Sequence, residues 1–207
     1  MAVQGMATTA REDLLAAGLA VFDRDGFEDA TVAAIRARAR ASNGSFFHFF
    51  GSKKELAGTL FLEVLQHYHA AMLAALDTRC GAREGVARLI GAHLDWVTNN
   101  RREARFLFEI SRSEWSDEVR GAQRAENAHL AEGIERWRAP LLARGELLPM
   151  TASLFLSQII GPAQIFCRAF LSGRDRTDPT EQSEALIACA IRAVVAPGAA
   201  EHNGAAP

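Results

Sequence analysis

The sequence predicts an all-α protein made of a three-helix head and a larger helical domain, and three observations lead to this prediction. Apolar residues recur at helical intervals, and Gly, Pro, Asn and Asp interrupt the periodic stretches. After residue 57 no stretch shows the alternating pattern of a strand. The chain has 207 residues and is 49% hydrophobic, so a second core can form beside the head.

The head is predicted to span residues 9–57 and to begin with an amphipathic helix. Gly26-Phe27 is expected to end this helix, because glycine interrupts helical conformation. The residues that recur at helical spacing on its apolar face are Leu14, Ala17, Val21 and Phe22.

Two short helices are predicted to follow, joined by a tight turn. Thr31 is suited to cap a helix from about Val32 to Arg38, and Ser42 is suited to cap a helix from Asn43 to Phe47. The Ser42 hydroxyl would accept the backbone N–H of Gly44 or Ser45.

A fourth helix is predicted to begin at Ser52 and to continue to about Thr78. Glu55 follows Ser52 at the spacing of a capping box, in which each of the two side chains accepts a backbone N–H near the other residue. Two short helices crossing through a tight turn have the geometry that places a helix in the DNA major groove.

The local charge agrees with a DNA-binding role. The whole chain has a formal net charge of −2, but residues 31–56 contain a single acid, Glu55. Affinity for duplex DNA comes largely from neutralising phosphates. A solvated basic helix face is the alternative interpretation. The basic residues in this stretch are Arg36, Arg38, Arg40, Lys53 and Lys54.

Taken together, roughly the first 57 residues resemble the DNA-binding domain of the TetR family of bacterial repressors. The resemblance depends on the combination and not on any one element. It includes the amphipathic first helix and its Gly26-Phe27 stop. The other matching residues are Thr31, Ile35, Ala39, Ser42, Gly44, Ser45, Phe50, Ser52, Lys53 and Leu56.

The resemblance implies a role for particular side chains. Thr31 would meet a phosphate at a helix N-terminus, and Lys53 would hold the DNA backbone at the start of the fourth helix. Thr31 and Ser52 would cap helices with or without DNA. The residues expected to face the groove are Asn43, Ser45 and His48, although His48 could simply be exposed.

Four positions depart from the family pattern. Arg40 stands where a turn glycine is usual, so we expect strain or an altered turn there. Arg36 replaces a small residue. Phe47 and Phe49 replace polar residues that would contact the DNA backbone, so DNA binding is either weaker than in relatives or supported by Arg36, Arg38 and Arg40.

The larger domain is predicted to span residues 58–196. Beyond the fourth helix, helical periods extend over 83–97, 102–111, 116–143, 151–171 and 180–196, with Ser116 as a cap. Residues 1–8 and 197–207 are predicted to be disordered tails, because they are rich in small and polar residues without periodicity.

The last two helices are predicted to form a dimer interface. The helix over 151–171 is apolar on more than one face, which indicates burial on two sides. The arrangement is similar to the four-helix dimer interface of the TetR family; completion of a monomeric bundle is the alternative. The predicted interface residues are Phe155, Ile159, Phe166, Leu186, Ala190, Ala193 and Val194.

The remaining helices are predicted to enclose a pocket for a small organic effector. A mainly apolar cavity with a few polar groups is typical of such sites. The alternative for each residue taken alone is an ordinary place in the core or on the surface. The candidates are His93, Trp96, Phe106, Glu109, His129, Trp137, Gln158 and Phe166.

Other classes find less support in the sequence. No phosphate-binding loop, nucleophile elbow or HExxH motif occurs, so no enzyme, cofactor or metal site is indicated. Cys167 and Cys189 lie in apolar helical stretches, so they are predicted to be buried thiols. No secretory signal precedes the first helix, and polar residues interrupt the apolar run at 152–171, so we expect a bacterial cytoplasmic protein without a membrane span.

The sequence therefore predicts a ligand-responsive, homodimeric regulator that binds double-stranded DNA. A repressor released from a palindromic operator by a small organic effector is the leading interpretation. A helical ligand-binding or interaction module with weakened DNA binding is an alternative, and an enzyme whose site is assembled from distant residues is another.

Overall fold

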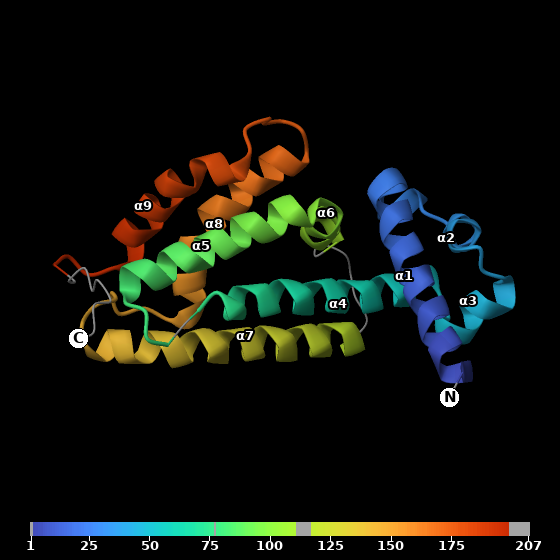
Figure 1. Ribbon diagram of the computed structural model, residues 1–207, viewed down its shortest axis with the longest axis horizontal. Helices are drawn as coiled ribbons and strands as arrows, with labels where there is room; N and C mark the ends of the chain where they lie inside the picture. The colour runs from blue at the N-terminus through green and yellow to red at the C-terminus, as the bar shows by residue number, and fades with distance from the viewer. Residues whose placement is uncertain (1, 77, 111–116, 199–207) are drawn as a thin grey trace. The chain divides into compact units, whose positions relative to one another are not determined.

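The computed structural model describes residues 2–76, 78–110 and 117–198 (Figure 1). These residues form helices and one isolated antiparallel bridge between Leu147 and Val195, which confirms the predicted all-α class. In chain order the elements are α1 (Ala2–Asp29), α2 (Val32–Ala39), α3 (Asn43–Phe49), α4 (Lys53–Ala74), α5 (Ala82–Asn99), α6 (Arg101–Ile110), α7 (Asp117–Ala143), α8 (Ala152–Leu171), the 3-10 helix η1 (Pro179–Gln182) and α9 (Ser183–Val194).

The first helix differs from its prediction at one end and agrees at the other. It begins at Ala2, so residues 2–8 continue the helix where a disordered tail was expected; Ala, Gln and Met in this stretch are good helix formers. At the other end Gly26 has φ 77° and ψ 166°, which interrupts the helix as predicted. Residues 199–207 of the second predicted tail and the predicted cap Ser116 lie outside the described residues.

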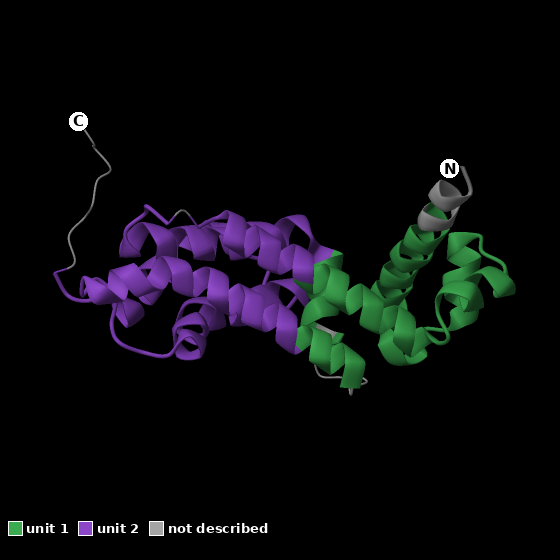
Figure 2. Cartoon of the chain, turned by 90° about the horizontal axis from the view of Figure 1, so that it is seen from below, with its two compact units in different colours: residues 1–65, 102–123 green, residues 66–101, 124–207 purple. Residues whose placement is uncertain are grey.

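The chain divides into two compact units, shown in different colours in Figure 2. The first contains residues 1–65 and 102–123, and the second contains residues 66–101 and 124–207. This division differs from the predicted boundary at residue 57. The boundary shifts because α4 continues without a break beyond Leu65 and because most of α6 packs in the first unit.

Contacts between α1 and α6 explain why most of α6 belongs to the first unit. Phe106 stacks on Phe22, with ring centroids 5.6 Å apart. Asp23 lies 2.8 Å from Arg105 Nε and 3.5 Å from Arg102 Nε. One carboxylate on α1 is therefore paired with two arginines of α6, next to an aromatic contact between the same helices.

The second unit has its core between α5, α8 and α9. These three helices contact one another pairwise. Leu89 and Leu94 of α5 and Phe155 of α8 are buried there. Trp137 is also fully buried, and its indole N–H donates to the Cys80 carbonyl at 3.2 Å. The helical periods predicted for this part of the chain thus correspond to α5, α7, α8 and α9.

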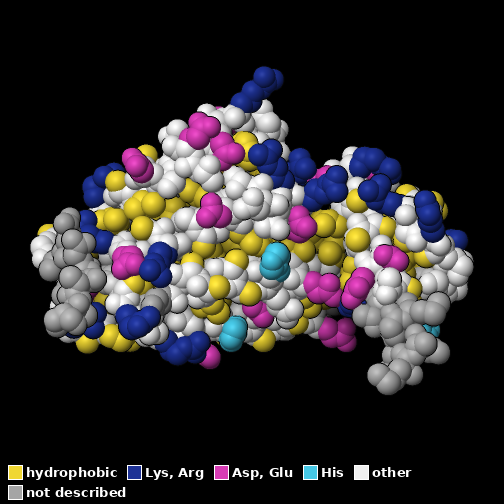
Figure 3. Space-filling view, in the orientation of Figure 1, with side chains coloured by type: hydrophobic (Ala, Val, Ile, Leu, Met, Phe, Trp, Pro, Cys, Tyr) yellow, Lys and Arg dark blue, Asp and Glu magenta, His cyan; other side chains and the backbone are white. Residues whose placement is uncertain are grey.

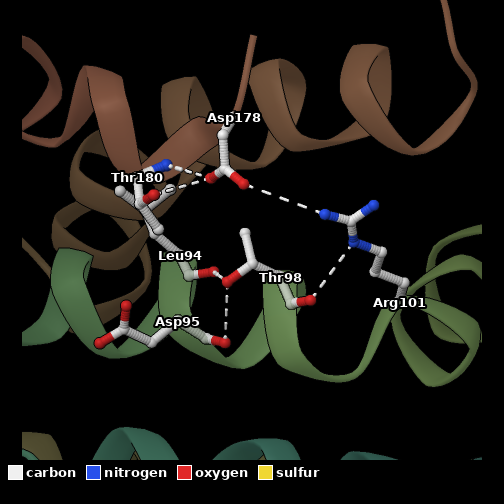
Figure 4. Close-up of polar contacts among 6 residues, drawn as sticks. All are labelled: Leu94, Asp95, Thr98, Arg101, Asp178 and Thr180. Carbon is white, nitrogen blue, oxygen red and sulfur yellow. Dashed lines mark hydrogen bonds and ion pairs between the residues drawn. The ribbon is translucent and has the colours of Figure 1, made fainter. Parts of the chain in front are cut away.

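Polar contacts connect the end of α5 to the segment before α9 (Figure 4). Arg101 Nε donates to the Thr98 carbonyl at 3.4 Å, and Arg101 Nη2 lies 3.9 Å from Asp178 Oδ2. Asp178 in turn accepts the backbone N–H of Thr180 at 3.0 Å and so caps η1. Arg101 also lies over the ring of Phe170, 4.6 Å from its centroid.

Helix α8 keeps much of its apolar surface outside this core. It is the one described helix whose length and composition would allow it to cross a membrane, yet only 22% of its most apolar window is buried. Within the chain, the residues of α8 that are buried are Phe155, Ile159, Ala163 and Cys167.

Candidate functional site

The helix-turn-helix is built from α2 and α3, and the caps predicted for both helices are present. Thr31 Oγ1 accepts the backbone N–H of Ala34 at 3.1 Å. Ser42 Oγ accepts the backbone N–H of Ser45 at 3.0 Å. Ile35 of α2 and Phe46 of α3 are both fully buried, so each helix is anchored to the head by one large apolar side chain.

The turn between these helices has the strained residue that the sequence predicts. Arg40 has φ 53° and ψ 33° and is the one described non-glycine residue with positive φ. The Ala41 N–H donates to the Arg36 carbonyl at 2.9 Å, and the Arg40 N–H donates to the Ala37 carbonyl at 3.3 Å. These two bonds form a Schellman motif, whose left-handed position is usually occupied by glycine.

The fourth helix opens with a modified capping box. The Glu55 N–H donates to Ser52 Oγ at 3.1 Å, as the pattern predicts. Glu55 Oε2 accepts the N–H of Gly51 at 2.8 Å and thus reaches one residue before the cap. The cap therefore satisfies two backbone donors and orders the connection between α3 and α4.

Most of the predicted DNA-binding residues are accessible on one segment of the head. Arg36 and Ser45 are half-buried. Lys and Arg side chains (dark blue) gather over α1 and α2 on the face drawn in Figure 3. Phe47, which the family pattern would have as tyrosine, is 50% exposed and does not belong to the core. The exposed residues of the predicted set are Thr31, Arg38, Arg40, Ser42, Asn43, Gly44, Phe47 and His48.

Lys53 is placed differently from its prediction. Its Nζ donates to the carbonyls of Phe27, Glu28 and Ala30 at 2.7, 3.0 and 2.8 Å, which uses all its three hydrogens. It also lies over the Phe27 ring, 4.7 Å from the centroid. A phosphate contact through Nζ would have to break these bonds. The geometry therefore favours a positioning role, in which Lys53 holds the end of α1 against the start of α4.

Arg36 is also engaged inside the head. Its Nη1 donates to Asn43 Oδ1 at 2.8 Å and so connects α2 to the first residue of α3. Its Nε is buried and has no hydrogen-bond partner among the described residues. Arg36 thus holds the Asn43 side chain and is not a free surface cation.

The predicted effector residues do not share one environment. Phe106 lies in the first unit, where it lines a cavity of about 220 Å³ with Phe22, Asp23, Phe27 and Arg105. Trp137 is packed against Phe155, with ring centroids 6.0 Å apart. His129 and Gln158 are exposed because they lie on the outer faces of α7 and α8, and Phe166 is half-buried. Nothing is described of the Glu109 side chain.

Two of the predicted effector residues do come together, and the sequence analysis missed their companion. The Tyr68 hydroxyl lies 2.9 Å from His93 Nδ1, and the rings of Tyr68 and Trp96 have centroids 4.9 Å apart. His93 and Trp96 are buried. The Trp96 indole N–H is buried without a hydrogen-bond acceptor among the described residues. Tyr68 is the chain's only tyrosine, and this was the feature of the sequence that could have marked it as a candidate.

Burial keeps this cluster uncharged at neutral pH. Desolvation lowers the pKa of His93 to about 4 and raises the pKa of Tyr68 above its usual value. The Tyr68–His93–Trp96 cluster therefore presents neutral hydrogen-bonding groups among aromatic rings, which suits an uncharged part of an organic ligand.

The low pKa of His93 predicts a specific loss of stability in acid. In the unfolded chain His93 has an ordinary pKa near 6.5, so it takes up a proton at a pH where the folded chain does not. Its contribution to stability is full above about pH 6.5 and is lost as the pH falls towards 4. Between pH 7 and pH 4.5 we expect the wild type to lose about 2 kcal/mol more unfolding free energy in urea than His93→Gln. Equal losses would show that His93 is protonated in the folded protein.

The predicted dimer residues divide between core and surface. Phe155, Ile159, Ala190 and Val194 are buried within the single chain, so they belong to its own core and the prediction for them is wrong. Phe166, Leu186 and Ala193 are half-buried. On α8 two large apolar side chains remain exposed, Leu154 (48% exposed) and Ile165 (72% exposed).

The cysteines also divide between core and surface. Cys80 and Cys167 are buried, and burial raises the pKa of Cys167 to about 12. Cys189 is exposed on α9, so the prediction of a buried thiol is correct for Cys167 and wrong for Cys189. Among the described residues no group of His, Cys, Asp and Glu side chains is arranged to hold a metal ion.

Fold and site together define a helix-turn-helix DNA-binding protein with a second, all-helical unit. Residues 14–60 match the model of the bacterial regulatory proteins of the tetR family. Many solved structures that carry the same family name share the fold. The head of the chain is therefore similar to the DNA-binding domain of TetR family regulators, and the whole chain has the fold of solved structures that carry that name.

Three of the similar solved structures cover nearly the whole chain. A putative tetR family regulator from Shewanella sp. PV-4 is 26% identical, with a TM-score of 0.72 over 91% of this chain and 99% of that chain. SmeT, the repressor of a Stenotrophomonas maltophilia multidrug efflux pump, is 19% identical, with a TM-score of 0.69 over 95% of each chain. FadR from Bacillus subtilis, in complex with stearoyl-CoA, is 15% identical, with a TM-score of 0.73 over 87% of this chain and 97% of that chain. The search of curated proteins gives no match.

Proposed function

We propose that this protein is a cytoplasmic, homodimeric repressor that binds a palindromic operator through α3 and is released by a small organic effector. The observation that carries the proposal is the geometry of the helix-turn-helix. Phe46 anchors α3 to the core while Asn43 and His48 stay exposed on the same helix. Polar side chains on a short, well-anchored helix are what direct reading of base edges needs.

The DNA-binding part of the proposal is tested by a gel shift on two kinds of duplex. The DNA upstream of the protein's own gene provides the candidate operator, and a random-sequence duplex of equal length measures nonspecific binding. We expect specific binding to exceed nonspecific binding by about a thousandfold or more. Equal affinity for both duplexes would favour the alternative of a helical module with weakened DNA binding.

Phe47→Tyr tests whether α3 faces DNA as proposed. Because Phe47 is 50% exposed, the added hydroxyl has room to donate to a phosphate. We expect operator binding to tighten by up to about 1 kcal/mol, the net value of one hydrogen bond. Phe47→Leu, which removes the ring without adding a donor, is the control and should not tighten binding. If Phe47→Tyr weakens binding in a titration, α3 docks in another orientation.

We propose that the dimer contact lies on the face of α8 that carries Leu154 and Ile165 and on the exposed face of α9. Leu154 and Ile165 are large apolar side chains that the single chain leaves uncovered, and Ala185 and Ala188 are exposed small residues on α9. Small residues permit close helix packing. Two such surfaces related by a two-fold axis would bury the apolar area that a single chain exposes.

The effector is proposed to contact the Tyr68–His93–Trp96 cluster. The buried Trp96 N–H lacks an acceptor among the described residues, and a ligand oxygen would satisfy it. FadR, which has the same fold, holds stearoyl-CoA, so the fold can accommodate a long organic ligand. The test is a melting-temperature screen with stearoyl-CoA and uncharged aromatic compounds, followed by operator titration with any compound that stabilises the protein. A compound that raises the melting temperature but leaves operator affinity unchanged would contradict the effector role.

A further inference from the structure

The contact between Arg36 and Asn43 limits what Asn43 can present to DNA. Arg36 belongs to α2, and its Nη1 lies 2.8 Å from the Asn43 side-chain oxygen. A guanidinium has only donors, so the amide atom that faces it must be the acceptor Oδ1. The Asn43 amide is thereby fixed in one orientation, and its NH₂ group lies on the other side. Asn43 is exposed, so this NH₂ group remains accessible.

The position of Arg36 is costly for stability, which points to a functional reason. Its Nε is buried without a hydrogen-bond partner among the described residues, and an unsatisfied buried donor destabilises a fold. Arg36 is half-buried and contacts Asn43 across the turn that contains Arg40. A smaller residue would avoid the buried Nε but would leave the Asn43 amide free to rotate.

Adenine and guanine differ in how well their major-groove edges can pair with an asparagine amide whose oxygen is already occupied. An asparagine with a free oxygen pairs with adenine, because adenine offers one acceptor (N7) and one donor (the N6 amino group). Guanine offers two acceptors, N7 and O6, and no donor. A guanidinium on Oδ1 occupies one lone pair, and its positive charge disfavours the approach of the adenine amino group. The donors that remain on Asn43 and Arg36 match the guanine edge.

We propose that Arg36 and Asn43 act as one donor unit that selects guanine over adenine at one base pair of each operator half-site. In this unit Asn43 contacts the base and Arg36 is the positioning residue. The inference rests on the proposed DNA-binding function and specifies the base that this part of the head reads.

The first step of the test locates the base pair. Selection from random duplexes by the full-length wild type gives the preferred site. The base pair at which Asn43→Ala loses discrimination is the one that Asn43 contacts. If the wild type selects no sequence at all, the proposed function itself fails. If it selects a sequence in which this base pair is A·T, the inference fails and the proposed function stands.

The second step measures dissociation constants for duplexes that differ only at this base pair. We expect the wild type to favour guanine over adenine by roughly five- to 150-fold, and to lose affinity when 7-deazaguanine removes N7. Arg36→Ala should reduce the guanine-to-adenine ratio at least fivefold by freeing Oδ1. Arg38→Ala removes the same charge from an exposed position of α2, so it should weaken binding to both duplexes without changing the ratio. An Arg36→Ala ratio equal to the wild-type ratio would overturn the proposal.

Asn43→Asp provides a test that does not alter the half-buried Arg36. The carboxylate keeps the partner of Arg36 but replaces the NH₂ donors with an acceptor. Because cytosine presents an amino donor in the major groove, we expect the preference at this base pair to shift from guanine to cytosine. A variant that folds and still prefers guanine would show that Asn43 does not read this base.

Discussion

Ile165→Glu is expected to dissociate the dimer without unfolding the chain. Ile165 is 72% exposed on α8, so a carboxylate at this position is solvated in the single chain and desolvated only in the proposed interface. Burying an unpaired charge in each subunit should weaken association by about 3 kcal/mol or more, a hundredfold or more in the dimer dissociation constant. Sedimentation velocity at micromolar concentration measures the change, and circular dichroism verifies the fold.

The control for this experiment is Ala128→Glu, which adds the same charge at an exposed position of α7. It should sediment as the wild type does. A glutamate at Ala190 would be uninformative, because Ala190 is buried in the protomer's own core and its substitution would unfold the chain. Should Ile165→Glu remain a dimer of wild-type affinity, the interface lies elsewhere.

Lys53→Met is expected to destabilise the head by about 2 kcal/mol. The methionine keeps most of the aliphatic stem but removes the charged donor for the carbonyls of Phe27, Glu28 and Ala30. Bonds from a charged donor are stronger than neutral ones, but part of this contact is exposed, so water replaces some of the loss. Hydrogen exchange of the α1–α3 amides reports the opening of the head itself.

The neighbouring Lys54 offers a matched control because it is exposed and carries the same charge. Lys54→Met should change head stability by less than about 0.5 kcal/mol. If instead Lys53→Met leaves hydrogen exchange unchanged and lowers the salt slope of DNA binding by about one unit, then Lys53 contacts a phosphate and its placement against α1 is incidental.

Local features of this chain could be predicted from the sequence with good accuracy. The caps at Thr31 and Ser42, the glycine interruption at Gly26 and the left-handed Arg40 all follow from interactions within a few residues. In such cases the side-chain chemistry at one position decides the backbone conformation beside it, and no tertiary information is needed.

The features that the sequence did not predict are tertiary contacts. Lys53 binds carbonyls more than twenty residues away in sequence, so its environment cannot be inferred from its neighbours. Helix α8 is apolar on more than one face, and periodicity alone does not indicate which side chains face the chain's own core. The Tyr68–His93–Trp96 cluster joins α4 to α5, and the pairing of those helices is a property of the fold.

Arg40 places a constraint on how far the head could be stabilised. A left-handed arginine costs roughly 1 kcal/mol relative to glycine, yet its side chain keeps a permanent cation at the C-terminal end of α2, where the helix dipole favours positive charge. Engineering that relaxes this turn with glycine would remove a charge from the surface that we propose contacts the phosphates. We therefore expect thermal stability and DNA affinity to be opposed at this single position of the head, a trade-off between stability and activity.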